Sequence, residues 1–312
     1  MEQQAFIHGL SGLSQLNHAC IVTIGSFDGV HLGHQQIIAR IVALAKAQGI
    51  PSAVVIFEPQ PHEYFAPQKN RPRLMRLREK VQALIASGVD HVVCLRFNKR
   101  LRNLSAEDFI AQVLVAGLKV KHLEVGDDFR FGCDRQGDFN LLQKAGQTHG
   151  FSVASSQTFI MHNARVSSTR IRNVLALQDL DYAKQLLGKP YCICGRVIYG
   201  KQLGQTIGVP TANIGLGRYP AAVSGVYAVE VTVAGRTYQG VANVGVKPTI
   251  TGQHKPVLEA HIFGFAGNLY GQFIAVAFCK MLRKEKKFDT LEQLVDQIQQ
   301  DCANAKIFFN KP

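Results

Sequence analysis

The chain changes its pattern of secondary structure near residue 187, and this change constrains the fold more than any other feature. Before it, short apolar runs alternate with segments whose apolar residues have helical spacing. The runs predict strands at residues 20–24, 53–57, 91–95, 122–125 and 151–154, and the segments between them predict helices at 34–48, 77–86, 105–115 and 139–148. Strict alternation requires crossover connections, so we expect an α/β domain with a parallel sheet and helices on both faces.

After residue 187, strand-like segments follow one another with Gly-rich turns between them. They predict strands at 192–199, 225–233, 237–244, 258–263 and 273–279, and one helix at 291–300. This order is typical of an antiparallel β-barrel closed by a C-terminal helix. Gly188 and Pro190 stop the preceding helix. The 312 residues therefore divide into predicted domains 1–187 and 188–312.

A glycine-rich loop from Gly25 to His34 joins the first predicted strand to the first helix. At the carboxyl end of a parallel strand, a helix N-terminus offers N–H groups and a positive dipole end to a phosphate. His31 and His34 can donate hydrogen bonds to phosphate oxygens as charge develops there. The spacing is neither that of a dinucleotide site nor that of a P-loop, and a zinc site or a purely structural turn is a weaker alternative. The nucleotide-binding candidates are Gly25, Ser26, Phe27, Asp28 and Gly29.

This loop, Gly-x-Phe-Asp-Gly-x-His-x-Gly-His, resembles the nucleotide-binding loop of the bacterial bifunctional riboflavin kinase/FMN adenylyltransferases, a family within the nucleotidyltransferase superfamily. Residues 165–172 resemble the superfamily's second motif, whose Ser and Arg hold a triphosphate. The resemblance implies a Rossmann-like fold and phosphate-binding roles for Arg165, Ser168 and Arg172. A serine there can cap the helix, and an arginine can bind phosphate in a bidentate manner. A simple helix cap with exposed arginines is the alternative for this segment taken alone.

Two further segments, residues 57–61 and 126–132, resemble the flavin-binding side of the same domain. Each follows a predicted strand and combines aromatic rings, which can stack on an isoalloxazine, with polar groups for its edge. The flavin-binding candidates are Phe57, Pro59, Asp128 and Phe131. For the phenylalanines, packing in the core is the alternative.

A second phosphate site is indicated where glycines recur every four residues before Pro-Thr-Ala-Asn. It is not a P-loop, because residue 202 is Gln where Ser or Thr would bind magnesium. On an extended segment, Thr211 and Asn213 point to one side and offer two neutral oxygens to a Mg²⁺ that is otherwise held by ATP and water. The nucleotide-binding candidates here are Gly200, Lys201, Gly204, Gly208 and Pro210.

This second region resembles the family's riboflavin kinase module, in which the Thr and Asn contact metal and nucleotide. The resemblance implies that Glu259 is the catalytic base and that Arg283 binds the flavin. The sequence departs from the family pattern at Gln205, Gly264 and Asn268. These departures concern the strength of nucleotide or flavin binding more than the chemistry.

The resemblance implies two reactions in one chain. The barrel would phosphorylate riboflavin with MgATP to give FMN, with Glu259 accepting the proton of the attacking hydroxyl. The N-terminal domain would transfer AMP from ATP to FMN, giving FAD and pyrophosphate, with His31, His34, Ser168 and Arg172 stabilising charge on the phosphates. A chain with only one active half is an alternative.

The composition limits the partners and the compartment. With 35 Lys and Arg against 22 Asp and Glu, the net charge is +13, which fits nucleic acid, an anionic membrane or phosphorylated ligands. We expect small-molecule substrates and no nucleic acid, because no nucleic-acid-binding motif appears; a flavin-responsive nucleic-acid-binding protein is the rival hypothesis. Seven cysteines without a Cys-x-x-Cys pair, no secretory leader and no long apolar run predict a cytoplasmic protein without membrane insertion. A monomer is the default expectation.

Overall fold

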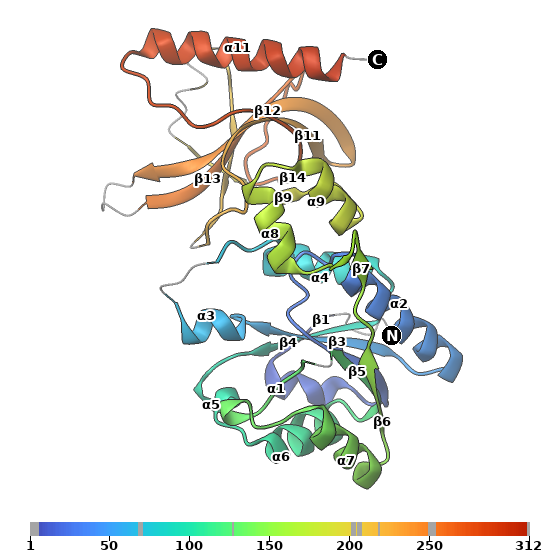
Figure 1. Ribbon diagram of the computed structural model, residues 1–312. Coiled ribbons are helices and arrows are strands. Elements are labelled where there is room, and N and C mark those ends of the chain that lie inside the picture. The colour runs from blue at the N-terminus through green and yellow to red at the C-terminus, as the bar shows by residue number, and fades with distance from the viewer. Residues whose placement is uncertain are drawn as a thin grey trace. The chain divides into compact units, whose positions relative to one another are not determined.

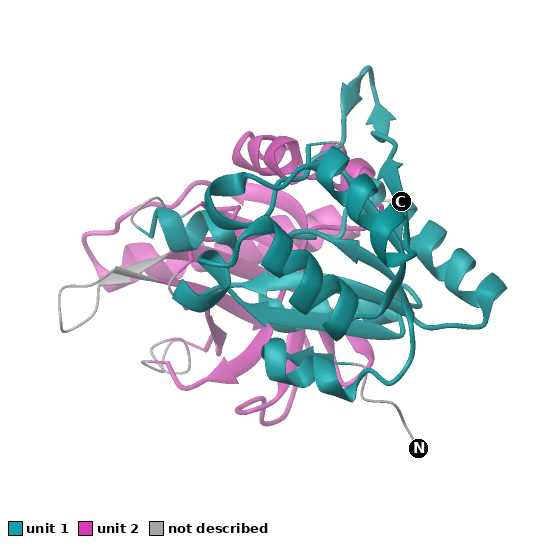
Figure 2. Ribbon diagram, turned by 90° about the horizontal axis from the view of Figure 1, so that it is seen from below, with its two compact units in different colours: residues 1–70, 75–167 teal, residues 71–74, 168–312 magenta. Residues whose placement is uncertain are grey.

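The computed structural model describes residues 6–67, 71–126, 128–200, 204, 208–217, 219–248 and 254–310 (Figure 1). The chain forms two compact units, coloured separately in Figure 2: residues 1–70 with 75–167, and residues 71–74 with 168–312. Helices α8 (Ser168–Ala176) and α9 (Leu180–Leu187) are grouped with the second unit, although the sequence pattern assigns them to the first predicted domain.

Unit 1 contains a six-stranded parallel sheet in the order β1-β4-β3-β2-β5-β6, which confirms the expected α/β fold. The strands are β1 (Phe6–His8), β2 (Cys20–Ile24), β3 (Ser52–Glu58), β4 (His91–Arg96), β5 (Val120–Gly126) and β6 (Ser152–Ser156). The α-helices are α1 (Gly9–Gly12), α2 (Leu32–Gln48), α3 (Pro61–Phe65), α4 (Leu77–Ala86), α5 (Lys99–Arg102), α6 (Ala106–Phe109) and α7 (Phe139–His149). Short helices η1 (Leu13–Gln15) and η3 (Cys133–Arg135), the π-helix η2 (Ile110–Gly117) and a hairpin of β7 (Ile160–Met161) and β8 (Ala164–Arg165) complete the unit.

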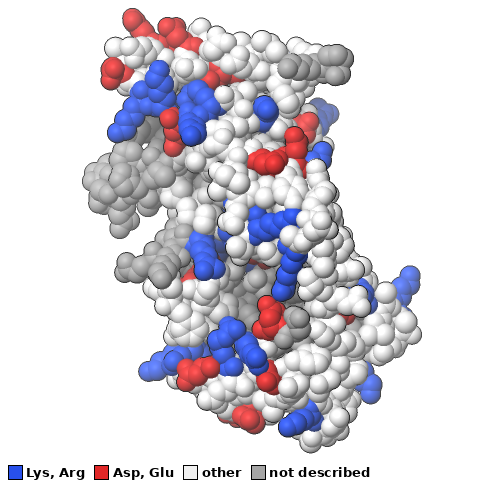
Figure 3. Space-filling view, viewed as in Figure 1, with Lys and Arg blue, Asp and Glu red and all other residues white. Residues whose placement is uncertain are grey.

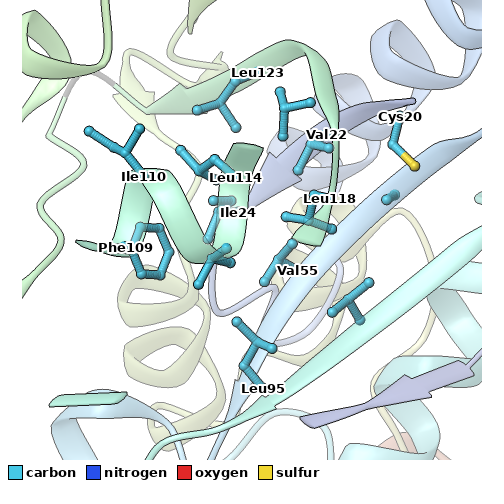
Figure 4. Close-up of a cluster of buried hydrophobic side chains, with 14 of the residues drawn as sticks. Cys20, Val22, Ile24, Val55, Leu95, Phe109, Ile110, Leu114, Leu118 and Leu123 are labelled. Carbon is cyan, nitrogen blue, oxygen red and sulfur yellow. The ribbon is translucent and has the colours of Figure 1, made fainter. Parts of the chain in front are cut away.

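The central strands β2, β3 and β4 are mostly apolar because both faces of the sheet are covered there. Successive side chains point to opposite faces, so Val55 packs on one side and Val54 on the other. One face is covered by η1, α6, η2 and α7, and part of this core is drawn in Figure 4. The other face is covered by α2 and α4.

The strand order places a topological switch point at β2. This strand lies between β3 and β5. The chain first continues from β2 to its neighbour on one edge, β3, and later comes back to its neighbour on the other edge, β5. Ligands of open α/β sheets bind outside the carboxyl ends of the strands at such a point. The loop that follows β2 and the segment that follows β5 both begin there.

Unit 2 contains a closed antiparallel barrel in the order β10-β13-β12-β11-β14-β9, followed by the C-terminal helix, as expected. Its elements are β9 (Cys192–Ile198), β10 (Ala212–Gly215), β11 (Gly225–Val233), β12 (Arg236–Pro248), β13 (His254–Ile262), β14 (Phe273–Arg283) and α11 (Leu291–Phe309). Helix α11 lies against β11, β12 and β14 on the outside of the barrel (Figure 1). Its buried Ala305 packs with Val226 and Val241.

Candidate active sites

The loop between β2 and α2 is held by buried polar contacts that do not involve its glycines. Lys80 on α4 is only 1% exposed, and its Nζ donates a hydrogen bond of 2.6 Å to the carbonyl of Ser26. The buried Asp28 accepts a hydrogen bond of 3.0 Å from the backbone N–H of Met75. These contacts fix the loop at the carboxyl end of β2. Sequence analysis missed Lys80, although it lies in the apolar stripe of its helix.

The backbone of this loop is strained in a way that suits a ligand site. Phe27 and Val30 have φ angles of 46° and 42°, a left-handed conformation that costs a residue with a β-carbon about 1–3 kcal/mol. Gly29 between them has a φ of 89°, which glycine adopts without that cost. Gly25 leaves room for the ring of Phe27, which would lie 3.0 Å from an added β-carbon.

The structure brings His31 and His34 together at the start of α2. Their rings are stacked with centroids 3.6 Å apart, and Nδ1 of His31 accepts a hydrogen bond of 3.4 Å from the backbone N–H of His34. An accepting Nδ1 carries no proton, so the neutral His31 ring carries its proton on Nε2. Burial lowers the pKa of His34 well below 6.5, and His31, Lys80 and Arg165 lower it further. His34 is therefore neutral near pH 7.

The β7–β8 hairpin carries Arg165 beside the segment that follows β5. Its Nη1 lies 3.6 Å from Oδ2 of Asp128, and the two side chains are 54% and 72% exposed. Such a pair contributes little to stability, because solvent screens it. Both groups are accessible to a ligand, and the charge of Arg165 also acts on His34. Arg165, predicted to bind phosphate, and Asp128, predicted to bind the flavin, are thus neighbours.

The flavin-binding candidates differ in their accessibility. Phe57 is half-buried at the end of β3 and contacts Phe97 edge to face, while Pro59 follows it in a half-buried turn. Phe131 is only 6% exposed and packs with Phe109 and Phe129, so its surroundings are those of a core residue.

Sequence analysis missed further aromatic residues that lie next to the flavin-binding candidate Phe57. Tyr64 and Phe65 on α3 both contact Phe97 edge to face, and Phe65 is largely exposed. The guanidinium of Arg102 lies 5.9 Å from the ring of Phe65. Tyr64 and Phe65 closely follow residues 57–61 in the sequence. The helix that carries them has only five residues, which is too short to show a helical pattern of apolar residues.

Ser168 and Arg172 lie on α8, which begins at Ser168 and belongs to unit 2. Nε of Arg172 donates a hydrogen bond of 2.6 Å to the carbonyl of Pro72, in the short segment 71–74 of the same unit. The guanidinium therefore has a defined position.

In unit 2, the strand register places three polar residues in a row. Glu259 on β13 is paired with Asn213 on β10 and with Asn243 on β12. Paired residues on adjacent antiparallel strands point to the same face, so the carboxyl lies between two amides. Asn213 is 7% exposed, and its Nδ2 donates a hydrogen bond of 3.3 Å to the carbonyl of Thr211. Asn243 was missed, because nothing in its local sequence marks it.

A cavity of about 330 Å³ opens beside this row, between the outer face of the barrel and α11. Glu259, Thr211, Asn243, Arg283 and Asp301 are among its lining residues. The predicted flavin-binding Arg283 donates to both carboxylate oxygens of the buried Asp301, at 2.8–3.0 Å. This bidentate pair fixes the end of β14 against α11. Asp301 was missed because it lies on a separate helix.

At two glycines before Pro210, other atoms of the chain lie so close to the backbone that a β-carbon would not fit. A β-carbon at Gly200 would lie 2.5 Å from Nδ2 of Asn213, and one at Gly204 would collide with the carbonyl of Val209. Gly208 has a φ of +75°. The carbonyl of Pro210 lies 2.8 Å from Nδ1 of His261. Lys201 lies outside the described residues.

Surface charge, possible metal ligands and helix hydropathy say less about function than the two sites do. On the face shown in Figure 3, Lys and Arg stand in separate groups with Asp and Glu between them. Among the described residues, no three His, Cys, Asp or Glu side chains are grouped as ligands of a metal ion. No described helix is both long enough and apolar enough to cross a membrane.

The fold defines a class of protein: a two-module chain that joins a Rossmann-like parallel sheet to a closed antiparallel barrel. The model of the FAD synthetase family matches residues 13–170, and that of the riboflavin kinase family matches residues 187–309. The chain belongs to the family of bifunctional riboflavin kinase/FMN adenylyltransferases, with the FAD synthetase domain first and the kinase domain second.

Curated relatives that bear this name include proteins of Pseudomonas fluorescens and Escherichia coli. The protein of Pseudomonas fluorescens is 49% identical over 300 residues, which cover 96% of each chain. The protein of Escherichia coli strain K12 is 47% identical over 305 residues, which cover 97% of each chain. A crystal structure described as a macrolide-efflux protein from Streptococcus pneumoniae has a TM-score of 0.80 at 27% identity, covering 99% of this chain and all of that one.

Proposed function

We propose that the barrel phosphorylates riboflavin with MgATP and that the N-terminal domain, residues 1–187, transfers AMP from a second ATP to the FMN formed. The observation that carries the kinase assignment is the position of Glu259, between Asn213 and Asn243 beside a 330 Å³ cavity. A carboxylate there can accept the proton of a substrate hydroxyl as that hydroxyl attacks the γ-phosphate. ATP, riboflavin and FMN are the substrates.

The residues present fit a magnesium ion held together with the nucleotide. Asn213 uses its amide nitrogen on the carbonyl of Thr211, so its Oδ1 is the atom that could serve as an oxygen ligand, and Gly200 leaves room for this side chain. Thr211 offers a hydroxyl on the same strand edge, and hard oxygen ligands suit Mg²⁺. When bound, the ion would neutralise charge on the phosphates. Gly200, Lys201, Gly204, Gly208 and Pro210 would position the nucleotide.

Within the cavity, Arg283 would contact the flavin with its position fixed by Asp301. Because the Asp301 carboxylate already balances the guanidinium charge, this contact would orient the neutral ring system without adding a net charge. Val226 and Phe288 supply apolar lining for the same ring system. Glu259 then lies where the ribityl chain would end.

In unit 1 the loop from Gly25 to Gly29 would hold the triphosphate at the N-terminus of α2. His31, with its proton on Nε2, and the neutral His34 would donate hydrogen bonds to oxygens that gain charge as pyrophosphate leaves. Arg165 would bind phosphate oxygens, and Ser168 and Arg172 keep the phosphate-binding roles that the sequence predicts for them. FMN supplies the nucleophile, so alignment and charge stabilisation are the protein's main contributions.

The flavin of this second reaction would lie along the carboxyl ends of β3 and β5, between Phe57, Pro59 and Asp128. The exposed Phe65 and its neighbour Phe97 extend that surface, whereas the buried Phe131 would support it from below. Aromatic faces of this kind stack on planar ring systems. The two functions would divide near residue 188, as domains 1–187 and 188–312.

We also propose small-molecule partners without nucleic acid, a cytoplasmic location and a monomer. None of the seven cysteines is in a disulfide, which supports a reducing compartment. The excess positive charge is explained by triphosphates and FMN. Incubating the protein with riboflavin, ATP and Mg²⁺ and separating the products over time tests the function: FMN should appear first and FAD second. Salt-sensitive nucleic-acid binding without turnover would support the rival hypothesis.

A further inference from the structure

Two cysteines on strand β9 place their thiols side by side. Cys192 and Cys194 are both half-buried on the outer face of the barrel, while Ile193 between them points inward and is buried. Their Sγ atoms are 3.7 Å apart. The Cys-x-Cys spacing on an extended strand produces this arrangement, because alternate side chains share one face. Neither proposed reaction uses these thiols.

The neighbouring strand leaves room for the pair. In the register of β9 with β14, Cys192 is opposite Ala277 and Cys194 is opposite Ala275. Side chains opposite each other on paired strands stand next to one another, and a methyl group is the smallest apolar neighbour a residue with a β-carbon can supply. On this strand pair, therefore, no large side chain stands opposite either thiol.

The geometry suits a bridge between the two sulfurs. Residues two apart on a strand have Cα atoms about 6.4–6.8 Å apart, at the upper end of the range for disulfides. Closure to a bond of about 2.05 Å needs rotation of both thiols and a small contraction of the strand. A tetrahedral atom with bonds of about 2.3 Å to sulfur spans about 3.8 Å, which matches the observed separation without movement.

Four other thiols of the chain are poor nucleophiles near neutral pH. Cys20 and Cys94 are fully buried, and burial raises the pKa of Cys20 to about 11. Burial also raises the pKa of Cys279 to about 11 and that of Cys302 above its ordinary value. Because the thiolate is the nucleophile, these four cysteines react slowly near neutral pH.

We propose that Cys192 and Cys194 form a dithiol site that is bridged by thiophilic electrophiles and closes to a disulfide by exchange with a low-mass disulfide such as glutathione disulfide. One thiolate attacks glutathione disulfide, forming a mixed disulfide and releasing one glutathione. The second thiolate attacks the protein sulfur of that mixed disulfide, forming the Cys192–Cys194 bond and releasing another glutathione. The two cysteines lose two electrons and two protons in total, and one glutathione disulfide becomes two glutathiones.

The first test uses phenylarsine oxide, an arsenical that bridges two thiols with loss of water. The reduced full-length protein should retain one arsenical through a wash with a monothiol and release it to a dithiol. Cys192→Ser and Cys194→Ser should each lose this retention, whereas Cys133→Ser should keep it. Unchanged retention in either of the first two variants would overturn the proposal.

The second test uses glutathione disulfide followed by peptide mass analysis without reduction. The unmodified protein should yield a peptide with both cysteines that has lost two hydrogens and carries no glutathione. Each single variant should instead carry one glutathione on the remaining thiol, since no second thiol resolves it. Stable glutathione on the unmodified pair, or a pair that stays reduced while Cys133 reacts, would contradict closure. Neither readout depends on the proposed enzymatic roles.

Discussion

Replacing Lys80 by Met tests whether a buried lysine holds the phosphate loop. The substitution keeps most of the side-chain length but removes the ammonium that donates to Ser26. A hydrogen bond from a charged group contributes about 1.5–3 kcal/mol, and the substitution removes this donor from the carbonyl of Ser26. At about 1.4 kcal/mol per factor of ten, kcat/KM for FAD formation should fall by about 10- to 150-fold.

The assay is FAD formation from supplied FMN and ATP, with FMN formation from riboflavin by the same preparation as the internal control. The kinase reaction should change little, because Lys80 belongs to unit 1. Lys144→Met on α7 is the matched control, since that lysine is exposed on the same unit. The pKa of His34, followed by NMR, should also rise in Lys80→Met, because one of the charges that lower it is gone. FAD formation within twofold of the unmodified protein would refute this account of the loop.

Three further predictions concern other parts of the chain. The free energy of unfolding should fall as the pH drops below about 6.5, by up to about 1.4 kcal/mol per pH unit, because His34 binds a proton in the unfolded chain but stays neutral in the folded one. Denaturant unfolding at about pH 5 to 8 should show this slope, and His34→Gln should reduce it. Asp301→Asn should raise the KM for riboflavin more than it lowers kcat, since it loosens Arg283; an unchanged KM would contradict this. Asn243→Ala should lower kcat/KM for riboflavin about tenfold while leaving FAD formation from FMN unchanged, because the amide faces Glu259 in the register; equal losses in both reactions would indicate misfolding instead.

Most elements of the fold could be predicted from the sequence because their signals are local. Strands such as Cys20–Ile24 are continuous apolar runs, and the Gly-rich hairpins of the barrel carry their own turn residues. Strand β1 (Phe6–His8) was missed, since three residues form a strand only by pairing with β4. The π-helical hydrogen bonding of residues 110–117 leaves the helical pattern of apolar residues intact, so the sequence did not distinguish it from an α-helix.

The candidate sites were predictable where a motif is contiguous. The loop from Gly25 to His34 is one such motif, and it leads into α2, whose N-terminus His31 caps. Partners that come from distant segments were not found: Asn243 depends on strand register, and Asp301 depends on the docking of α11. Lys80 left a usable signal, because a charged residue within the apolar stripe of a helix must find a buried acceptor.

The central claim is that one chain holds two separate active sites, and Glu259→Gln and His31→Ala test it together. Each variant is supplied with riboflavin or with FMN, in the presence of ATP and Mg²⁺, and the flavins are separated chromatographically over time. Glu259→Gln should make no FMN from riboflavin but should convert supplied FMN to FAD at the normal rate. His31→Ala should convert riboflavin to FMN and accumulate it, with little FAD. Loss of both reactions in either variant while it remains folded, or undiminished FAD formation by His31→Ala, would contradict the account.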